Sequence, residues 1–335
     1  MGVRQAPPRS TLAYANAQRP AVLFERVFYA LLAKFEHLGG GWPAPRKFRF
    51  KAKLLSLDAT VIELCLGLFP WAKFRPTKGA VKLHLLLDHE GYFPVFARLT
   101  EGAVHELTVA RQLRLPAASI VAFDRGYNDY RLFAAWTAQR VWFVTRQKAA
   151  AVYTVLERRV LPEHRNIRAD EIIQVQVGHG PAARALTLRR VVVWNAAKQE
   201  ELVLLTNHLQ FGPTTIAAIY RDRWQIEIFF KELKQHLKLK TFVGTSPNAL
   251  KTQIWTALIA MLLLKYLKFR AQAGLSLANL VALLRWNLFT YRELTAWLAD
   301  PYAAPPPEPD PPGPPGPVQL EFTFGTASGR TELAT

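Results

Sequence analysis

The sequence predicts an α/β fold of the α+β type, built on one mixed sheet, and three observations support this prediction. Strand-like and helical segments alternate over residues 48–147. A second, β-rich segment follows at 148–212, and helical patterns fill 213–300. With 50% hydrophobic residues, the 335-residue chain can bury a sizeable core.

The charge of the chain predicts a polyanionic partner. Lys and Arg number 43 against 25 Asp and Glu, a formal net charge of +18, which attracts nucleic acid or an anionic membrane. Apolar runs such as Trp255–Leu264 fall short of the roughly 20 residues that span a bilayer, and the N-terminus has no signal-peptide pattern. We therefore expect a nucleic-acid partner, no membrane, and a cytoplasmic, nucleoid-associated protein. With one cysteine, Cys65, and scattered histidines, any catalytic metal is expected to sit on carboxylates.

Residues 1–47 are expected to form a helical lead-in, with a helix at Leu23–Phe35 that ends before the breakers Gly39–Gly41. Residues 48–147 follow the order β-β-β-α-β-α-β. The predicted strands and helices are, in chain order, Leu54–Asp58, Val81–Asp88, Tyr92–Leu99, Val104–Leu113, Ser119–Phe123, Tyr130–Gln139 and Val141–Thr145. This order is that of a ribonuclease H-like core, in which the strand ending at Asp58 lies beside the strand that leads into Asp124.

The remaining segments complete the predicted domain order. Residues 148–212 are interpreted as an inserted β subdomain, and 213–300 as a helical layer on the core. Its helices are expected from Thr214 through Lys234, at Pro247–Gln272 and at Ser276–Leu298. The proline-rich segment 301–335 is predicted to be a disordered tail.

One predicted helix carries polar side chains on a single face. At 100° per residue, Tyr220, Arg223, Glu227 and Lys234 fall within an arc of roughly 60°. Apolar residues occupy a neighbouring arc, so burying them on the sheet leaves the polar face along its edge. Such a helix brings one carboxylate among phosphate-binding groups. Glu232 lies about 140° from Glu227 and is expected to face solvent.

Three acids at this edge suit phosphodiester chemistry. Two divalent ions about 3.5–4 Å apart can stabilise both the attacking and the leaving oxygen, and Mg²⁺ prefers carboxylate oxygens. We predict Asp58, Asp124 and Glu227 as the catalytic metal ligands, with Asp58 bridging two Mg²⁺ ions that Mn²⁺ can replace. An isolated Asp at a strand end is more often a cap, so the prediction depends on all three acids together.

Six residues are predicted to contact DNA. Arg223 would grip phosphate with its planar fork and Lys234 as a point charge, whereas Tyr220 would bond phosphate or stack on a displaced base. The full set is Tyr220, Arg223, Lys234, Lys231, Arg125 and Tyr127. The alternative for each charged residue is an ordinary surface charge. Trp224 is expected in the core, and His84 as a hydrogen-bonded structural histidine.

These motifs resemble those of DDE transposases of the bacterial insertion-sequence-four family. The helix YRDRWQIEIFFKELK matches the family spacing of Tyr, Arg, Glu and Lys, and the surroundings LDATVIELC and AFDRGYND of the two aspartates are similar. The resemblance spans residues 48–298. It implies a metal-dependent endonuclease that frees 3′-hydroxyl ends of its element and joins them to target DNA, usually as a dimer on paired ends. Because family members have more helical sequence before Arg9–Pro20, the N-terminus is expected to be truncated.

Two other functions remain open at this stage. A truncated, non-catalytic DNA-binding protein derived from a transposase would share these features, and a cellular nuclease such as a junction resolvase would share the fold but lack the spaced helix. The tail segment Gln319–Phe324 faintly resembles peptides that dock on the bacterial sliding clamp. A disordered stub is the alternative interpretation of that segment.

Overall fold

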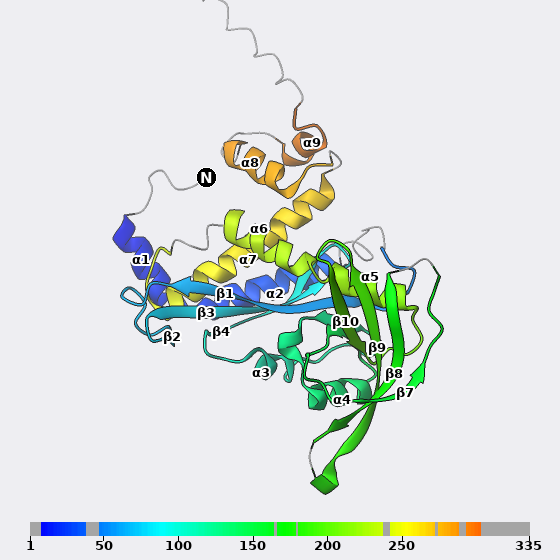
Figure 1. Cartoon of the computed structure of the whole chain (residues 1–335). Coiled ribbons are helices and arrows are strands. Elements are labelled where there is room, and N and C mark those ends of the chain that lie inside the picture. Colours follow the sequence, from blue (N-terminus) through cyan, green and yellow to red (C-terminus); the bar gives the residue numbers. More distant parts are fainter. Residues whose placement is uncertain are drawn as a thin grey trace, which may run out of the picture.

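A ten-stranded mixed sheet runs through the protein, with helices on both of its faces (Figure 1). The computed structural model describes residues 8–37, 47–163, 166–178, 180–236, 242–271, 274–287 and 293–302. Of the predicted tail at 301–335, residues 303–335, which include the clamp-like segment, lie outside the described residues.

The centre of the sheet has the predicted strand order. The order is β2-β3-β1-β5-β6-β10-β9-β8-β7, with β4 paired to β3. Neighbours β1 and β3 are antiparallel, whereas β5 is parallel to β1 and to β6. The bounds are β1 Leu54–Leu64, β2 Lys73–Arg75, β3 Lys78–Asp88, β4 Phe93–Glu101, β5 Ile120–Phe123, β6 Trp142–Arg146, β7 Thr154–Arg158, β8 Ile167–Val177, β9 Arg184–Asn195 and β10 Glu200–Thr206. The run β4-β3-β1-β5-β6 confirms the ribonuclease H-like arrangement.

The β-rich insertion does not form a sheet of its own. Its last strand, β10, pairs antiparallel with β6, with Leu205 opposite Thr145, so β7 to β10 prolong the central sheet. The strand content predicted for this segment is confirmed, but the insertion continues the core sheet instead of standing apart. Backbone groups at the edge of β6 are thereby paired.

Alternation along β1 separates the two faces of the sheet. Leu55 and Leu57 pack in one core cluster with Phe133. Leu54, on the opposite face, packs with Ile216. Because side chains two residues apart share a face, Asp58 lies on the same side of the sheet as Ile216.

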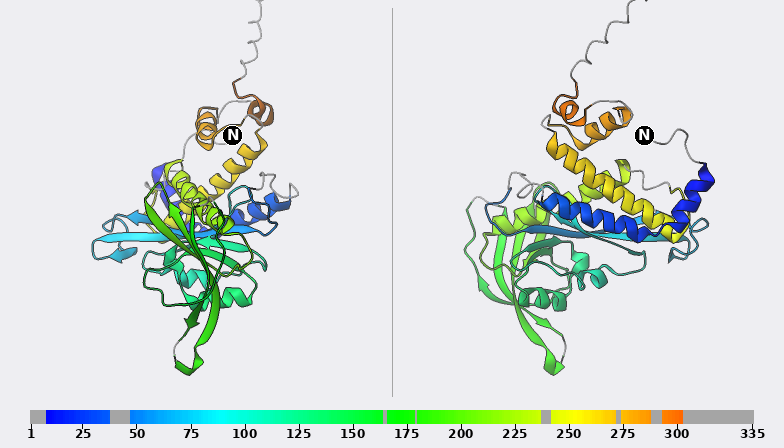
Figure 2. Two further views of the ribbon diagram at one scale, coloured as in Figure 1. Left: turned by 45° about the vertical axis from the view of Figure 1, so that its right-hand side comes forward. Right: turned by 180° about the vertical axis from the view of Figure 1, so that it is seen from behind.

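The helices divide between these faces. Helices α2, α6 and α7 cover β1 and β3 on one side, whereas α3 and α4 lie on the other (Figures 1 and 2). Their bounds are α1 Arg9–Gln18, α2 Ala21–His37, α3 Glu106–Ala110, α4 Tyr130–Ala138, α5 Pro213–Asp222, α6 Gln225–His236, α7 Pro247–Arg270, α8 Leu277–Asn287 and α9 Leu294–Ala299, with single 3₁₀ turns η1 Arg125–Tyr127 and η2 Gly180–Ala182.

The predicted helix from Thr214 to Lys234 is two helices, which corrects the wheel argument. Helix α5 ends at Asp222 and α6 starts at Gln225. At the junction the Trp224 amide bonds the Arg221 carbonyl at 3.3 Å, a tightened turn instead of a continued α-helix. The segment predicted as one helix at Ser276–Leu298 likewise contains both α8 and α9.

The N-terminal segment is more ordered than the sequence indicated. Helix α1 was not predicted, and the Asn248 side chain at the start of α7 bonds the Arg19 carbonyl and accepts from the Ala21 amide, fixing the α1–α2 corner. Helix α7 is by length and composition the one described helix that could cross a membrane. Its buried side chains pack against α2 and α6, as expected of a core helix.

Candidate active site

Asp58 and Asp124 lie on adjacent strands. Leu57 of β1 pairs with Phe123 of β5 in parallel register, so the next residues, Asp58 and Asp124, are neighbours across strands about 4.8 Å apart. Strand β1 continues to Leu64, which corrects the prediction that Asp58 ends it. It is β5 that stops here, and the Asp124 carboxylate caps the following turn by accepting from the Gly126 amide at 2.7 Å.

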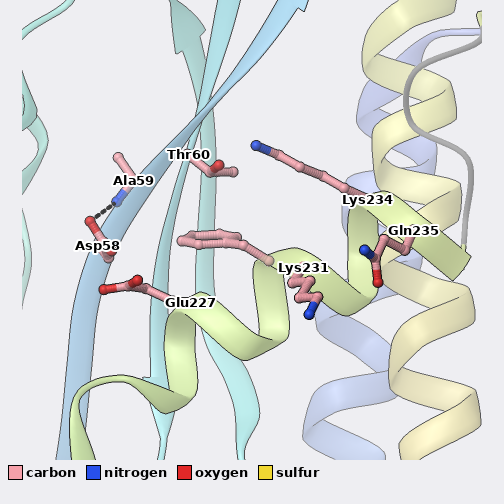
Figure 3. A pocket seen from close by; sticks show the side chains of 8 residues that line it. Asp58, Ala59, Thr60, Glu227, Lys231, Lys234 and Gln235 are labelled. Atoms are coloured by element: carbon pink, nitrogen blue, oxygen red, sulfur yellow. Dashed lines mark hydrogen bonds between the residues drawn. The ribbon is translucent and has the colours of Figure 1, made fainter. Parts of the chain in front are cut away.

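The third acid comes from a helix above the sheet. Glu227 lies in the first turn of α6, and in Figure 3 its carboxylate and that of Asp58 point toward one another. Together they border a pocket of about 500 Å³. The pocket is lined by Asp58, Ala59, Thr60, Glu227, Phe230, Lys231, Lys234 and Gln235. The sequence argument had not identified Thr60 or Gln235, whose short polar side chains have no distinctive spacing.

Arg223 joins the two carboxylates. Its Nη2 donates to Glu227 Oε1 at 2.6 Å, and its Nη1 lies 3.6 Å from Asp58 Oδ2. The side chain is only 10% exposed, and its guanidinium lies 5.6 Å from the Tyr220 ring centroid. Its Nε is buried and has no hydrogen-bond partner among the residues that the structure describes. The guanidinium therefore acts as the counter-cation of the two acids.

This arrangement disfavours the ionised form of the Asp58 carboxyl group. Burial raises the pKa of Asp58 to about 7, and the neighbouring Asp124 and Glu227 add to the increase. The Ala59 amide, which donates to Asp58 at 2.8 Å, and Arg223 lower that pKa, but they do not outweigh burial. A carboxylate raised in this way gains from a further positive charge.

These features fit a divalent cation. Three acids lie together beside the C-terminal end of β5, and Arg223 is the cation that contacts two of them. Among the described residues, no three His, Cys, Asp or Glu side chains already stand in coordinating positions. Instead, one Glu227 oxygen is held by Arg223, and Asp124 Oδ1 by the Gly126 amide. Asp58, Asp124 and Glu227 are nevertheless the oxygen donors that such an ion prefers.

The residues predicted to contact DNA are not all placed alike. Arg125 and Lys231 are exposed, and Lys234 lines the pocket while donating to the Val61 carbonyl at 3.0 Å. Tyr220 is partly buried beside Arg223. Tyr127, however, is only 2% exposed because it packs in the cluster under the sheet. That burial corrects the expectation that Tyr127 contacts DNA directly.

Two further expectations have opposite outcomes. Trp224 was expected in the core but is 58% exposed at the α5–α6 junction. His84 is fully buried, bonds the Thr100 hydroxyl at 2.9 Å and lies opposite Ala59, on the face of the sheet away from Asp58. The structural interpretation of His84 is therefore confirmed.

Comparisons with known proteins agree with this geometry. Residues 49–263 match the family described as the transposase DDE domain. A protein named as a transposase in Sinorhizobium fredii is 29% identical over 294 residues, which cover 87% of this chain and 80% of that protein. A transposase for an insertion sequence element of Synechocystis is 38% identical over 300 residues, covering 87% and 81%.

A solved structure is more distantly similar. The piggyBac transposase in a synaptic complex with hairpin DNA aligns with 82% of this chain and 63% of its own, at 12% identity and a TM-score of 0.39. The family match covers more than half of the chain and includes both strand aspartates and the glutamate helix. The chain belongs to the DDE transposases of insertion sequences.

Proposed function

We propose that the protein cleaves DNA at the ends of an insertion sequence and joins the freed 3′ ends to target DNA, using Mg²⁺ held by Asp58, Asp124 and Glu227. The observation that supports this most strongly is the convergence of three acids from β1, β5 and α6 beside the C-terminal end of β5. Two of them share a pocket with basic side chains. Acids that perturb one another in this way are typical of catalytic sites.

The metal would supply Lewis-acid stabilisation of the reacting phosphate oxygens. Asp58 and Glu227 are expected to hold it from opposite sides of the pocket, and Asp124 from the neighbouring strand. Mn²⁺, which also accepts oxygen ligands, is expected to substitute. Arg223 contacts both Asp58 and Glu227, and a bound cation would take over their neutralisation and leave the guanidinium fork available to a phosphate oxygen.

The DNA path would run along α6. Lys234 lines the same pocket as Asp58 and Glu227, and in Figure 3 it extends toward β1 near Thr60. Lys231 is exposed one turn earlier on the helix, and Arg125 is exposed just after Asp124. Basic groups on both sides of the acids would hold the flanking phosphates. The net charge of +18 would draw DNA to this surface.

The protein is further proposed to work as a dimer on paired element ends, in the bacterial cytoplasm. The alternative, a non-catalytic DNA-binding relative, keeps the same fold and charge. The placement of three acids together favours the enzyme, because a binding protein has no use for carboxylates that repel phosphate.

Plasmid cleavage tests this function. Supercoiled DNA carrying the ends of the element that encodes the chain is incubated with Mg²⁺ or Mn²⁺ and the protein. The wild type should cut at the ends, Glu227→Gln should not, and Glu232→Gln, the same change on the same helix, should cut normally. DNA binding with no cutting by any of the three proteins would instead support the non-catalytic alternative.

A further inference from the structure

A buried hydrogen-bond chain links β1 to the end of α5. Ser56 Oγ and His89 Nε2 are 2.6 Å apart, and His89 Nδ1 lies 2.6 Å from Asp222 Oδ2. The other carboxylate oxygen of Asp222 accepts from Lys47 at 2.5 Å. Ser56, His89 and Asp222 come from three separated segments of the chain, so only the fold brings them together.

The direction of each hydrogen bond in this network follows from the ionised state of Asp222. Burial alone would raise the pKa of Asp222, but hydrogen bonds from His89 and Lys47 outweigh it and hold that pKa below its ordinary value. An ionised carboxylate only accepts, so His89 Nδ1 donates to Asp222, and in the neutral ring Nε2 accepts from the Ser56 hydroxyl. Both ring nitrogens of His89 and both carboxylate oxygens of Asp222 thereby have a hydrogen-bond partner.

The arrangement has the atoms of a serine nucleophile site but not its access. Ser56 is fully buried, and the side chains of His89 and Asp222 are 6% and 1% exposed. No ester or amide substrate could reach the hydroxyl. The role of these hydrogen bonds is therefore structural.

Its two ends lie next to the proposed active site. Ser56 precedes Asp58 by two residues on β1 and shares its face of the sheet. Asp222 is the last residue of α5 and directly precedes Arg223, which bonds Glu227 and faces Asp58. The hydrogen bonds of His89 thus close a ring between the strand that carries one acid and the helix junction that presents the other.

His89 is itself held firmly. Its backbone amide donates to the Leu54 carbonyl at 3.0 Å, and its ring contacts Tyr92 edge to face with centroids 5.5 Å apart. The α5–α6 junction, by contrast, is crossed by tightened turns in place of a continuous helix, because the amides of Trp224, Ile226 and Glu227 each bond the carbonyl three residues back. Without a tether on Asp222, the direction in which α6 leaves the junction would be less defined.

We propose that His89 is a positioning residue, which clamps the α5–α6 junction to β1 and so fixes Glu227 and Arg223 relative to Asp58. This inference rests on the proposed function for its catalytic consequence. Its structural part, the clamp on the junction, stands independently. Residues that orient metal ligands typically change metal affinity or activity by about 10- to 100-fold when they are replaced.

Four variants separate the clamp from general stability. His89→Ala removes both bonds, His89→Asn keeps a donor near the Nδ1 position, and Ser56→Ala removes only the hydroxyl. The matched control is His84→Ala, which removes a buried histidine from β3, the strand that leads into the His89 turn, but lies on the opposite face of the sheet from Asp58. All four are compared below their melting temperatures.

Two readouts are measured, and the first is cleavage. In His89→Ala the Mn²⁺ concentration for half-maximal cutting should rise about 10-fold or more with DNA affinity unchanged, whereas His89→Asn and Ser56→Ala should shift less. His84→Ala should lose melting temperature without changing the Mn²⁺ requirement. A wild-type Mn²⁺ requirement in His89→Ala, or an equal shift in His84→Ala, would overturn the proposal.

The second readout does not need activity. Hydrogen exchange of peptides spanning residues 220–230 should become faster in His89→Ala and stay at the wild-type rate in His84→Ala. If the wild type cuts no DNA, the proposed function fails, yet this exchange still decides the clamp. Unchanged exchange at 220–230 in His89→Ala would refute it.

Discussion

The buried ion pair between Asp170 and Arg189 is predicted to be the most sensitive point of the sheet extension. Arg189 Nε and Nη2 donate to the two Asp170 oxygens at 2.7 and 2.6 Å, and both side chains are 2% exposed. Arg189 Nη1 also bonds the carbonyls of Leu209 and Phe211. The pair therefore ties β8 and β9 to the loop that leads into α5.

Arg189→Met leaves a buried carboxylate without its partner and removes the donor of two loop carbonyls. Breaking one side of such a pair costs about 3–5 kcal/mol, a large part of the roughly 5–15 kcal/mol by which a domain is stable. Replacing both members, in Asp170→Leu with Arg189→Met, removes the unpaired charge and should recover most of the loss.

Urea unfolding followed by circular dichroism at 25 °C measures both changes as free energies of unfolding. The single variant should lose about 3–5 kcal/mol, and the double variant should be more stable than the single one. A loss below about 1 kcal/mol, the usual value for an exposed pair, would refute the reasoning. A double variant less stable than the single one would do the same.

Three further predictions concern pH, the guanidinium and DNA. Burial lowers the pKa of His84 to about 4 from 6.5, so its contribution to stability is complete above pH 6.5 and is lost as the pH falls toward 4. Between pH 7 and pH 5 the free energy of unfolding should fall by about 2 kcal/mol from this cause. Urea titrations of His84→Gln should lack this fall, and the same pH dependence in the variant and the wild type would contradict a lowered pKa of His84. Arg223→Lys keeps the charge but loses the planar fork of the guanidinium. The single-turnover cleavage rate should therefore fall about tenfold or more, which is about 1.4 kcal/mol or more in activation free energy. A wild-type rate would show that the reaction does not need the fork. Lys234→Gln should lower the slope of log affinity against log salt by about 1 in filter-binding assays, and an unchanged slope would mean that Lys234 meets no phosphate.

The central sheet was predictable because its signals are local. Alternating and continuous apolar runs gave the strands at Leu54–Asp58, Val81–Asp88 and Ser119–Phe123, and their order alone selected the ribonuclease H-like arrangement. The three acids followed from their place after or within these strands and from the spacing around Glu227. The pairing of β10 with β6 was not predictable, because no local pattern specifies which strand edge a β insertion joins.

The break between α5 and α6 shows where local signals fail. Neither Gly nor Pro stands near Arg223, and helix-forming residues continue on both sides, so the pattern favours one helix. The break coincides with the burial of Asp222 against His89, a contact between segments far apart in the sequence. The exposure of Trp224 and the burial of Tyr127 could not be predicted from local signals either. Residue type alone does not say whether an aromatic side chain faces the core or solvent.

Crystals of the protein soaked in Mn²⁺ would test the central claim most directly, by anomalous diffraction at the manganese edge. The account predicts anomalous density between Asp58, Asp124 and Glu227, with Glu227 released from Arg223, and no such density in crystals of Glu227→Gln. Well-diffracting crystals with Mn²⁺ elsewhere, and with the Arg223–Glu227 pair intact, would contradict it.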